Sequence, residues 1–205
     1  LGWVVAWDKG DFIGKQALAA AKDKGVVQYG MAPSWNQEWA LANEFHFWTY
    51  TFGGKIVDEQ GCFEFNKDPN TLAALQFMID ALKEGVANPA GLTYDQATAQ
   101  DAFLKGDTLF LPQGIAGLMA YTQDPNISKV AGQVKDGLVP GATPDLSATL
   151  TLPEAYAIPA NSKHKEAAWK FIQFMTSRET NKILAQEIGL LPIWTDLYTD
   201  PDLLA

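Results

Sequence analysis

The sequence predicts an α/β protein in which helices flank a mixed sheet. Stretches rich in β-branched and aromatic residues alternate with stretches whose apolar residues recur at helical spacing. The opening shows this order clearly, since residues 3–7 predict a strand, 12–24 a helix that stops at Gly25, and 26–31 a second strand. A strand–helix–strand unit of this kind favours a parallel or mixed sheet.

The tryptophan-rich stretch after Pro33 predicts a long helix that ends at the glycine pair Gly53 and Gly54. Ser34 is expected to cap this helix, because serine is a preferred N-cap residue. One face of the helix is then expected to carry Trp35, Trp39, Ala42, Phe45 or His46, and Thr49.

The same alternation continues to residue 137. A helix is expected over 71–83, opened by Pro69 and stopped by Gly85. A second is expected over 96–104, capped by residues 93–96 and closed by Gly106, and a third from about 115 to 121. A short strand pair is expected around Ile56 and Phe63, and a buried strand at 109–111. Residues 122–137 predict a loop with a short turn at 127–128.

The last third of the chain combines loops with two helices. Residues 137–161 are rich in Pro and Gly, and loops of this composition commonly surround binding sites. An amphipathic helix is expected over 161–177, and a second from Ser177 to Ile188, ended by Gly189. The residues expected to face inward in the first of these helices are Ala167, Ala168, Phe171, Ile172 and Met175.

Charge and cysteine usage exclude several classes of function. The formal net charge of -9 repels phosphate backbones, and no basic stripe opposes it, so nucleic acid is not expected as a partner. Cys62 is the only cysteine, which excludes an internal disulfide and a cysteine-based metal site. No apolar run reaches the roughly 18 residues needed to span a bilayer, and the first residues lack a secretory-signal pattern. A soluble chain is expected, with both ends cut from something longer.

No catalytic constellation is evident. His46 and His164 lie far apart on expected helices, without an acid or nucleophile pattern near either. Phosphate loops, nucleophile elbows and metal-ligand spacings are also missing from the sequence. Asp8 and Asp11 form a carboxylate pair, yet aspartates in a turn normally bond their own backbone. We therefore expect a binding module rather than an enzyme, with no cofactor and no metal.

Four segments together resemble the extracellular solute-binding proteins that deliver sugars to ABC importers. They are residues 102–107, 156–162, 165–172 and 189–192, and their order and spacing extend the resemblance to about residues 26–205. The resemblance implies a type II periplasmic-binding-protein-like fold, with the second lobe over 25–157 and, over 158–205, helices that in the family cover the first lobe. It also implies a periplasmic or lipid-anchored extracellular location, a carbohydrate ligand, and importer membrane subunits as partners.

The first 24 residues resemble a different family. The run from Asp8 to Leu18, behind Leu1–Val5, is similar to the glycine cleavage T-protein, a folate-dependent aminomethyltransferase. This resemblance implies an engineered or recombined chimera, while chance similarity in favourable turn chemistry is the alternative. An enzyme fragment of the aminomethyltransferase kind is a distant alternative, because the folate-binding body of that family is absent from the sequence.

Candidate sugar contacts follow from the chemistry of carbohydrates. Sugars present apolar C–H faces and a rim of hydroxyls, so their sites pair aromatic side chains with planar polar ones. The stretch after the second strand offers both kinds, in Trp35, Asn36, Gln37 and Trp39. The alternative is that Trp35 and Trp39, four residues apart, form the hydrophobic stripe of the helix.

Further contacts are expected from the resemblance. Gln113 stands where the family often has a glycine and then a sugar-stacking tryptophan. Ile115 and Ala116 follow here, so Tyr121 or Trp35 would have to replace that aromatic surface, or binding is weak. Glu154 and Tyr156 flank the expected hinge strand, although Glu154 is equally typical of a solvated loop. The sequence thus predicts weak or no carbohydrate binding, and the alternative is a ligand-free scaffold.

The last two helices also suggest self-association. In the family, their apolar stripes cover the first-lobe sheet, most of which is missing from this sequence. The helices must therefore fold back onto the remaining lobe or be shared between two chains, and a homodimer is the favoured expectation.

Overall fold

The computed structural model describes residues 25, 27–114, 118–135, 137–139, 141–143, 145–150, 152 and 154–204. The chain divides into two compact units, Leu1–Ile115 with Thr122–Leu150, and Ala116–Tyr121 with Thr151–Ala205. The strand and helix expected within residues 1–24, and the stretch resembling T-protein, lie outside the described residues. No described helix is long and apolar enough to cross a membrane.

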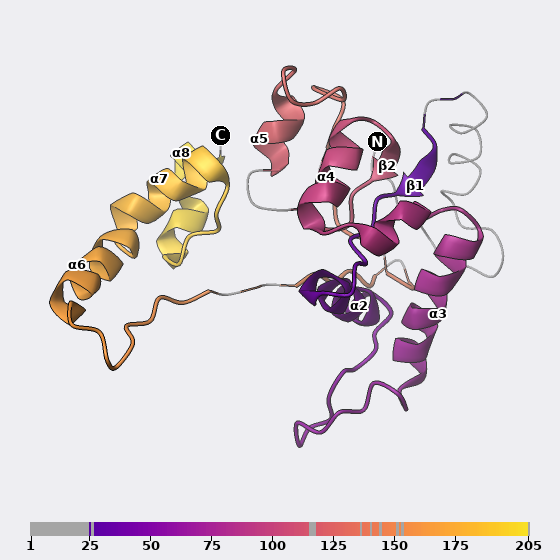
Figure 1. Ribbon diagram of the computed structural model, residues 1–205, viewed down its shortest axis with the longest axis horizontal. Coiled ribbons are helices and arrows are strands. Elements are labelled where there is room, and N and C mark those ends of the chain that lie inside the picture. Colours follow the sequence, from indigo (N-terminus) through magenta and orange to yellow (C-terminus); the bar gives the residue numbers. More distant parts are fainter. Residues whose placement is uncertain are drawn as a thin grey trace. The chain divides into compact units, whose positions relative to one another are not determined.

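Among the residues that the structure describes, two short parallel strands form the sheet of the first unit. Strand β1 (Tyr29–Met31) pairs with β2 (Thr108–Phe110), with Tyr29 opposite Thr108 and Met31 opposite Phe110. Figure 1 shows the two strands side by side, although more than seventy residues of chain separate them in sequence. Ala87 forms a further parallel bridge to Met31. This parallel pair agrees with the expectation of a parallel or mixed sheet, and a helical crossover joins its strands, as parallel pairing requires. The buried strand expected at 109–111 lies at 108–110 and becomes exposed at Phe110.

Helix α2 (Trp39–Thr51) begins four residues later than the Ser34 cap predicts. Ser34 does not cap it, because the serine hydroxyl donates to the carboxylate of Glu44 instead, and Glu38 occupies the N-cap position without a side-chain bond. The residues expected to share one face do not share one environment, since Thr49 is buried whereas Trp39 and Ala42 are exposed. The residues that α2 buries are Ala40, Glu44, Phe47, Trp48, Thr49 and Thr51.

The next helices follow their local signals. Helix α3 (Pro69–Lys83) has the Asp68 carboxylate accepting from the Thr71 backbone N–H at 2.7 Å, and Gly85 follows its end with a φ of +67°. After a short 3₁₀ helix η1 (Pro89–Thr93), α4 (Gln96–Leu104) is capped by Asp95, whose carboxylate accepts from Thr98 N–H at 2.7 Å. The predictions of these two α-helices are confirmed.

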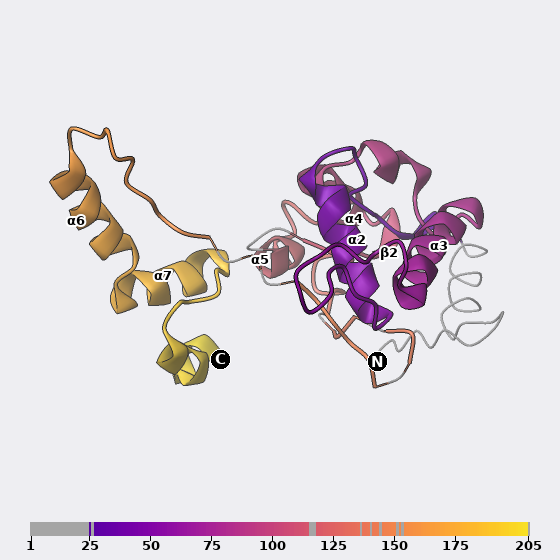
Figure 2. The same cartoon turned by 90° about the horizontal axis from the view of Figure 1, so that it is seen from below.

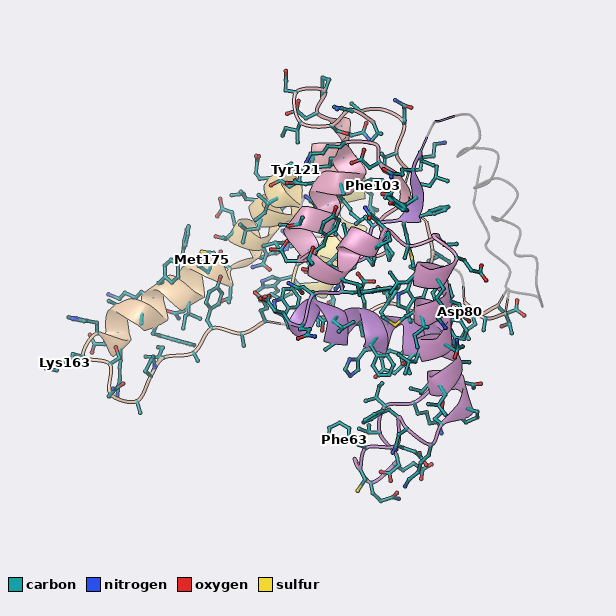
Figure 3. The ribbon with its side chains drawn as sticks, turned by 45° about the vertical axis from the view of Figure 1, so that its right-hand side comes forward. Phe63, Asp80, Phe103, Tyr121, Lys163 and Met175 are labelled. Carbon is teal, nitrogen blue, oxygen red and sulfur yellow. The ribbon has the colours of Figure 1, made fainter. Side chains whose placement is uncertain are left out.

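A small hairpin between α2 and α3 matches the expected strand pair. Val57 and Phe63 form an antiparallel bridge, and Glu64 N–H donates to the Ile56 carbonyl at 2.9 Å. Figure 3 shows Phe63 at the far end of the loop, away from the helices.

Aromatic side chains from α2 and α3 form the core of the first unit. The Trp48 ring lies edge to face with Phe47 at 4.8 Å and with Phe77 at 4.7 Å between ring centroids. Met31 of β1 and Met78 of α3 belong to the same buried cluster. This core fixes α2 against the strand that precedes it.

The second unit is built mainly from helices (Figure 2). These are α6 (Lys165–Met175), α7 (Arg178–Ile188), the 3₁₀ helix η2 (Thr195–Thr199) and α8 (Pro201–Leu204), while α5 (Leu118–Gln123) straddles the division between the units. The boundaries expected for α7 are confirmed, since Ser177 caps it and Gly189 ends it with a φ of +67°. Two cations of α7 hold the segment that follows, as Arg178 pairs with Asp196 at 2.6 Å and Lys182 with Asp200 at 3.0 Å.

Of the residues expected to face inward in α6, Ala168, Ile172 and Met175 are half-buried, whereas Ala167 and Phe171 are exposed. No residue of α6 is buried, and Phe171 is 56% exposed. Within the described part of the second unit, α6 contacts α7, and its Phe171 ring meets Tyr156 edge to face at 6.3 Å. This packing leaves most of its apolar side chains in contact with solvent.

Candidate ligand-binding site

The segments that leave β1 and β2 meet at one edge of the sheet. Because the strands are parallel, their carboxyl ends lie at the same edge, which is where open α/β sheets bind ligands. Residues 32–38 continue β1 and residues 111–114 continue β2. The Ala32 backbone N–H donates to the Phe110 carbonyl at 3.2 Å, so the two segments leave the sheet together.

A buried carboxylate anchors the segment after β1. Glu44 Oε1 accepts from both the backbone N–H and the hydroxyl of Ser34, each at 2.7 Å, and Oε2 accepts from Trp35 Nε1–H at 2.8 Å. Burial raises the pKa of Glu44 above its ordinary value, although the hydrogen bonds from Ser34 and Trp35 oppose this shift. Since the folded-state pKa is raised, the contribution of Glu44 to stability decreases as pH rises through that pKa.

The 3₁₀ helix η1 also holds the segment that follows β1. Trp35 N–H donates to the Gly91 carbonyl at 2.8 Å, and Asn36 N–H donates to the Tyr94 carbonyl at 3.2 Å. Pro33 lies directly against Gly91, where a Cβ atom would overlap the proline ring and approach the Pro33 carbonyl oxygen to 2.8 Å. The backbone of residues 33–36 is therefore held between η1 and α2.

Replacing Gly91 with alanine is expected to push Pro33 and the following residues away from η1. The overlap involves a rigid ring and backbone rather than a flexible side chain, so the free energy of unfolding should fall by about 1–3 kcal/mol. Urea denaturation followed by circular dichroism measures this change. Gly61→Ala is a comparison variant without overlap, because no atom lies within 4 Å of the position that its Cβ would take, although its φ of +78° adds backbone strain. Equal unfolding midpoints for Gly91→Ala and the wild type would contradict the expectation.

The structure separates the two tryptophans of the predicted site. Trp35 is only 3% exposed, and its indole N–H is bonded to Glu44, so its ring belongs to the core. Trp39, the first residue of α2, is 57% exposed. The hydrophobic-stripe interpretation thus describes the surroundings of Trp35, while Trp39 offers an open aromatic surface.

The polar residues of the predicted site include two buried oxygen atoms without a partner. Asn36 Oδ1 and Gln113 Oε1 are shielded from solvent, and neither accepts a hydrogen bond from any residue that the structure describes. They belong to the segments that follow β1 and β2, respectively. Gln37 is exposed beside Asn36. Buried acceptors of this kind are costly to leave unpaired, by about 1–3 kcal/mol each.

The remaining predicted contacts belong to the second unit. Tyr121 and Glu154 are exposed, and Tyr156 is exposed with one edge against Phe171. Within the described residues, no group of three or more His, Cys, Asp or Glu side chains is placed to hold a metal ion.

Glu44 is the residue that sequence reasoning missed. A signal was present, since it is the one charged residue among the apolar and aromatic residues of α2. A charge in such a helix is either at its solvent-facing side or paired inside. The helical period assumed from Ser34 placed it on the wrong face.

Comparison with known proteins identifies a family and its fold. The family model described as bacterial extracellular solute-binding protein matches residues 7–182. The maltotriose-binding protein of Pyrococcus abyssi is 25% identical over 92% of this chain and 40% of its own length. A probable ABC transporter-binding protein of Deinococcus radiodurans is 26% identical over 77% of this chain and 37% of its own length.

Two solved structures share the fold. Maltose-bound MalE3 of T. maritima superposes with a TM-score of 0.76 at 23% identity, over 98% of this chain and 50% of its own. A ribitol complex of an ABC transporter solute-binding protein from Agrobacterium radiobacter superposes with a TM-score of 0.73 at 24% identity. The match covers 99% of this chain and 50% of that protein. The fold is thus the type II periplasmic-binding-protein-like α/β fold, and the chain spans half or less of the length of these relatives.

Proposed function

Because this chain belongs to the family of bacterial extracellular solute-binding proteins, we propose that it binds a carbohydrate at the carboxyl edge of β1 and β2 for an ABC importer. The observation that carries the location is the pair of unpartnered buried oxygens, Asn36 Oδ1 and Gln113 Oε1, on the two segments that leave that edge. The exposed ring of Trp39 follows the first of these segments.

The chemistry of this edge suits a sugar. The Asn36 and Gln113 side chains are only half-buried, so a small rotation of each can bring its amide oxygen to a sugar hydroxyl, which removes the free-energy cost of leaving that oxygen unpaired. The apolar C–H face of a sugar ring can stack on the Trp39 indole, and Gln37 adds an exposed amide beside it. Trp35 would support the site without touching the sugar, because its ring is buried. Tyr121, Glu154 and Tyr156 stay predicted contacts from the second unit.

The relatives support carbohydrate as the ligand class. Their names and titles give maltotriose, maltose and ribitol as what those proteins bind. Because this chain spans about half of the solved relatives, we expect these 205 residues alone to bind in the millimolar range, about -4 kcal/mol. Binding outside the cytoplasm, in the periplasm or on a lipid anchor, is proposed from the family's description.

A binding role is proposed in preference to catalysis. The relatives are binding proteins, and the family match starts at residue 7, so it takes in most of the stretch that resembles T-protein. Neither a chimeric origin nor an aminomethyltransferase activity is needed to account for that stretch.

Titration with maltose, maltotriose and ribitol tests the proposal. We expect the tryptophan fluorescence to change with at least one of them, with half-saturation at about millimolar concentration. The absence of any change with all three, up to tens of millimolar, would favour a ligand-free scaffold.

Self-association is a separate proposal. The second unit exposes large apolar side chains on α6, including Trp169, Phe171 and Phe174. Such a surface favours a symmetric dimer, so we expect light scattering after size-exclusion chromatography to give twice the mass of one chain. A single-chain mass at high protein concentration, without binding of a hydrophobic dye, would contradict it.

A further inference from the structure

We infer that Glu44 is the positioning residue of the binding segment, defined as residues 34–39, through its three hydrogen bonds to Ser34 and Trp35. The inference rests on the proposed function, because it assigns Glu44 to the segment that carries Asn36 and Trp39. Glu44 itself is 1% exposed and would not touch the sugar.

The side chain of Glu44 connects helix α2 to the segment that follows strand β1. It lies in the second turn of α2, and its side chain reaches residues nine and ten positions earlier in the chain. Ser34 and Trp35 are the start of the binding segment, and Trp39 is the start of the helix. The carboxylate therefore closes a loop, because it bonds to the start of the segment and is carried by the helix that begins at the segment's other end.

The bonding pattern requires a carboxylate. Its two oxygens serve three donors, with two at Oε1 and the indole N–H at Oε2. A glutamine of the same shape has one acceptor oxygen and an amide nitrogen that only donates. In either orientation of that amide, Trp35 or Ser34 would face a donor in place of an acceptor.

The carboxylate satisfies three buried donors, but it does so at the cost of burying a charge. Burying a charge is unfavourable, and this burial raises the pKa of Glu44. An apolar side chain would avoid that cost but would leave the Ser34 N–H, the Ser34 hydroxyl and the Trp35 indole N–H without an acceptor. The gain from the carboxylate lies in the fixed geometry of the segment at the sheet edge.

Glu44→Gln is the direct test, with Glu84→Gln as the matched control, since Glu84 is an exposed carboxylate beyond α3. In ¹H–¹⁵N spectra, we expect Glu44→Gln to shift the Trp35 indole signal and the backbone signals of Asn36 and Trp39. We expect its affinity for maltotriose to fall by about tenfold or more, because a hydrogen bond to a charged group is lost. Glu84→Gln should change neither.

Two further measurements keep the inference decisive. Ser34→Ala removes only the hydroxyl donor, so it should shift the same signals and weaken maltotriose binding by a smaller factor even if Glu44→Gln folds poorly. Unchanged signals at Asn36 and Trp39 in both variants would overturn the inference whether or not any sugar binds. Unchanged affinity despite shifted signals would also overturn it. The absence of sugar binding by the wild type would instead count against the proposed function.

Discussion

Replacing Trp39 with alanine is expected to lower the affinity for maltotriose at least tenfold. The indole is 57% exposed at the start of α2, so its removal takes away an aromatic surface for the sugar without opening a cavity in the core. For the same reason, the free energy of unfolding should change by no more than about 0.5 kcal/mol. Saturation-transfer NMR on the sugar protons measures binding without relying on tryptophan fluorescence.

Trp169→Ala is the control for this experiment. Trp169 is exposed to a similar degree but lies on α6 of the second unit, outside the proposed site. It should leave the affinity unchanged. Equal binding by Trp39→Ala and the wild type would remove Trp39 from the site, and a loss confined to Trp169→Ala would place the sugar elsewhere.

Replacing Trp48 with alanine is expected to reduce the free energy of unfolding by about 3–5 kcal/mol. The ring is 5% exposed and packs between Phe47 and Phe77, so its loss leaves a large cavity where α2 meets α3. Guanidinium denaturation followed by circular dichroism measures the change. Tyr50→Ala, an exposed position on the same helix, should stay within about 0.5 kcal/mol. A Trp48→Ala midpoint equal to that of Tyr50→Ala would mean that this core does not hold the unit together.

Elements with local signals were predictable from the sequence. Helices α3, α4 and α7 each begin at an aspartate or serine whose side chain accepts from a backbone N–H of the first turn. Each is also followed within two residues by a glycine with positive φ. These signals lie within a few residues of the helix ends, so they can be read without knowing the rest of the fold.

The start of α2 was not predictable in this way. Ser34 has the chemistry of an N-cap, but a carboxylate ten residues later takes its hydroxyl. Trp35 is buried in the same bond network whereas Trp39 is exposed, so the two tryptophans that helical periodicity placed on one face have different surroundings. The buried face of α6 was only partly predictable, for a related reason. Its apolar spacing predicts a buried side, but burial depends on what packs against that side.

Mapping of maltotriose-induced shifts in the ¹H–¹⁵N spectrum is the most direct test of the central claim, that sugar binds where β1 and β2 end. The account predicts that the largest shifts appear at the side-chain amides of Asn36 and Gln113 and at the Trp39 indole, and that they saturate with one common affinity. Shifts that spare all three groups while others change would contradict it, as would a spectrum that does not respond to the sugar at tens of millimolar.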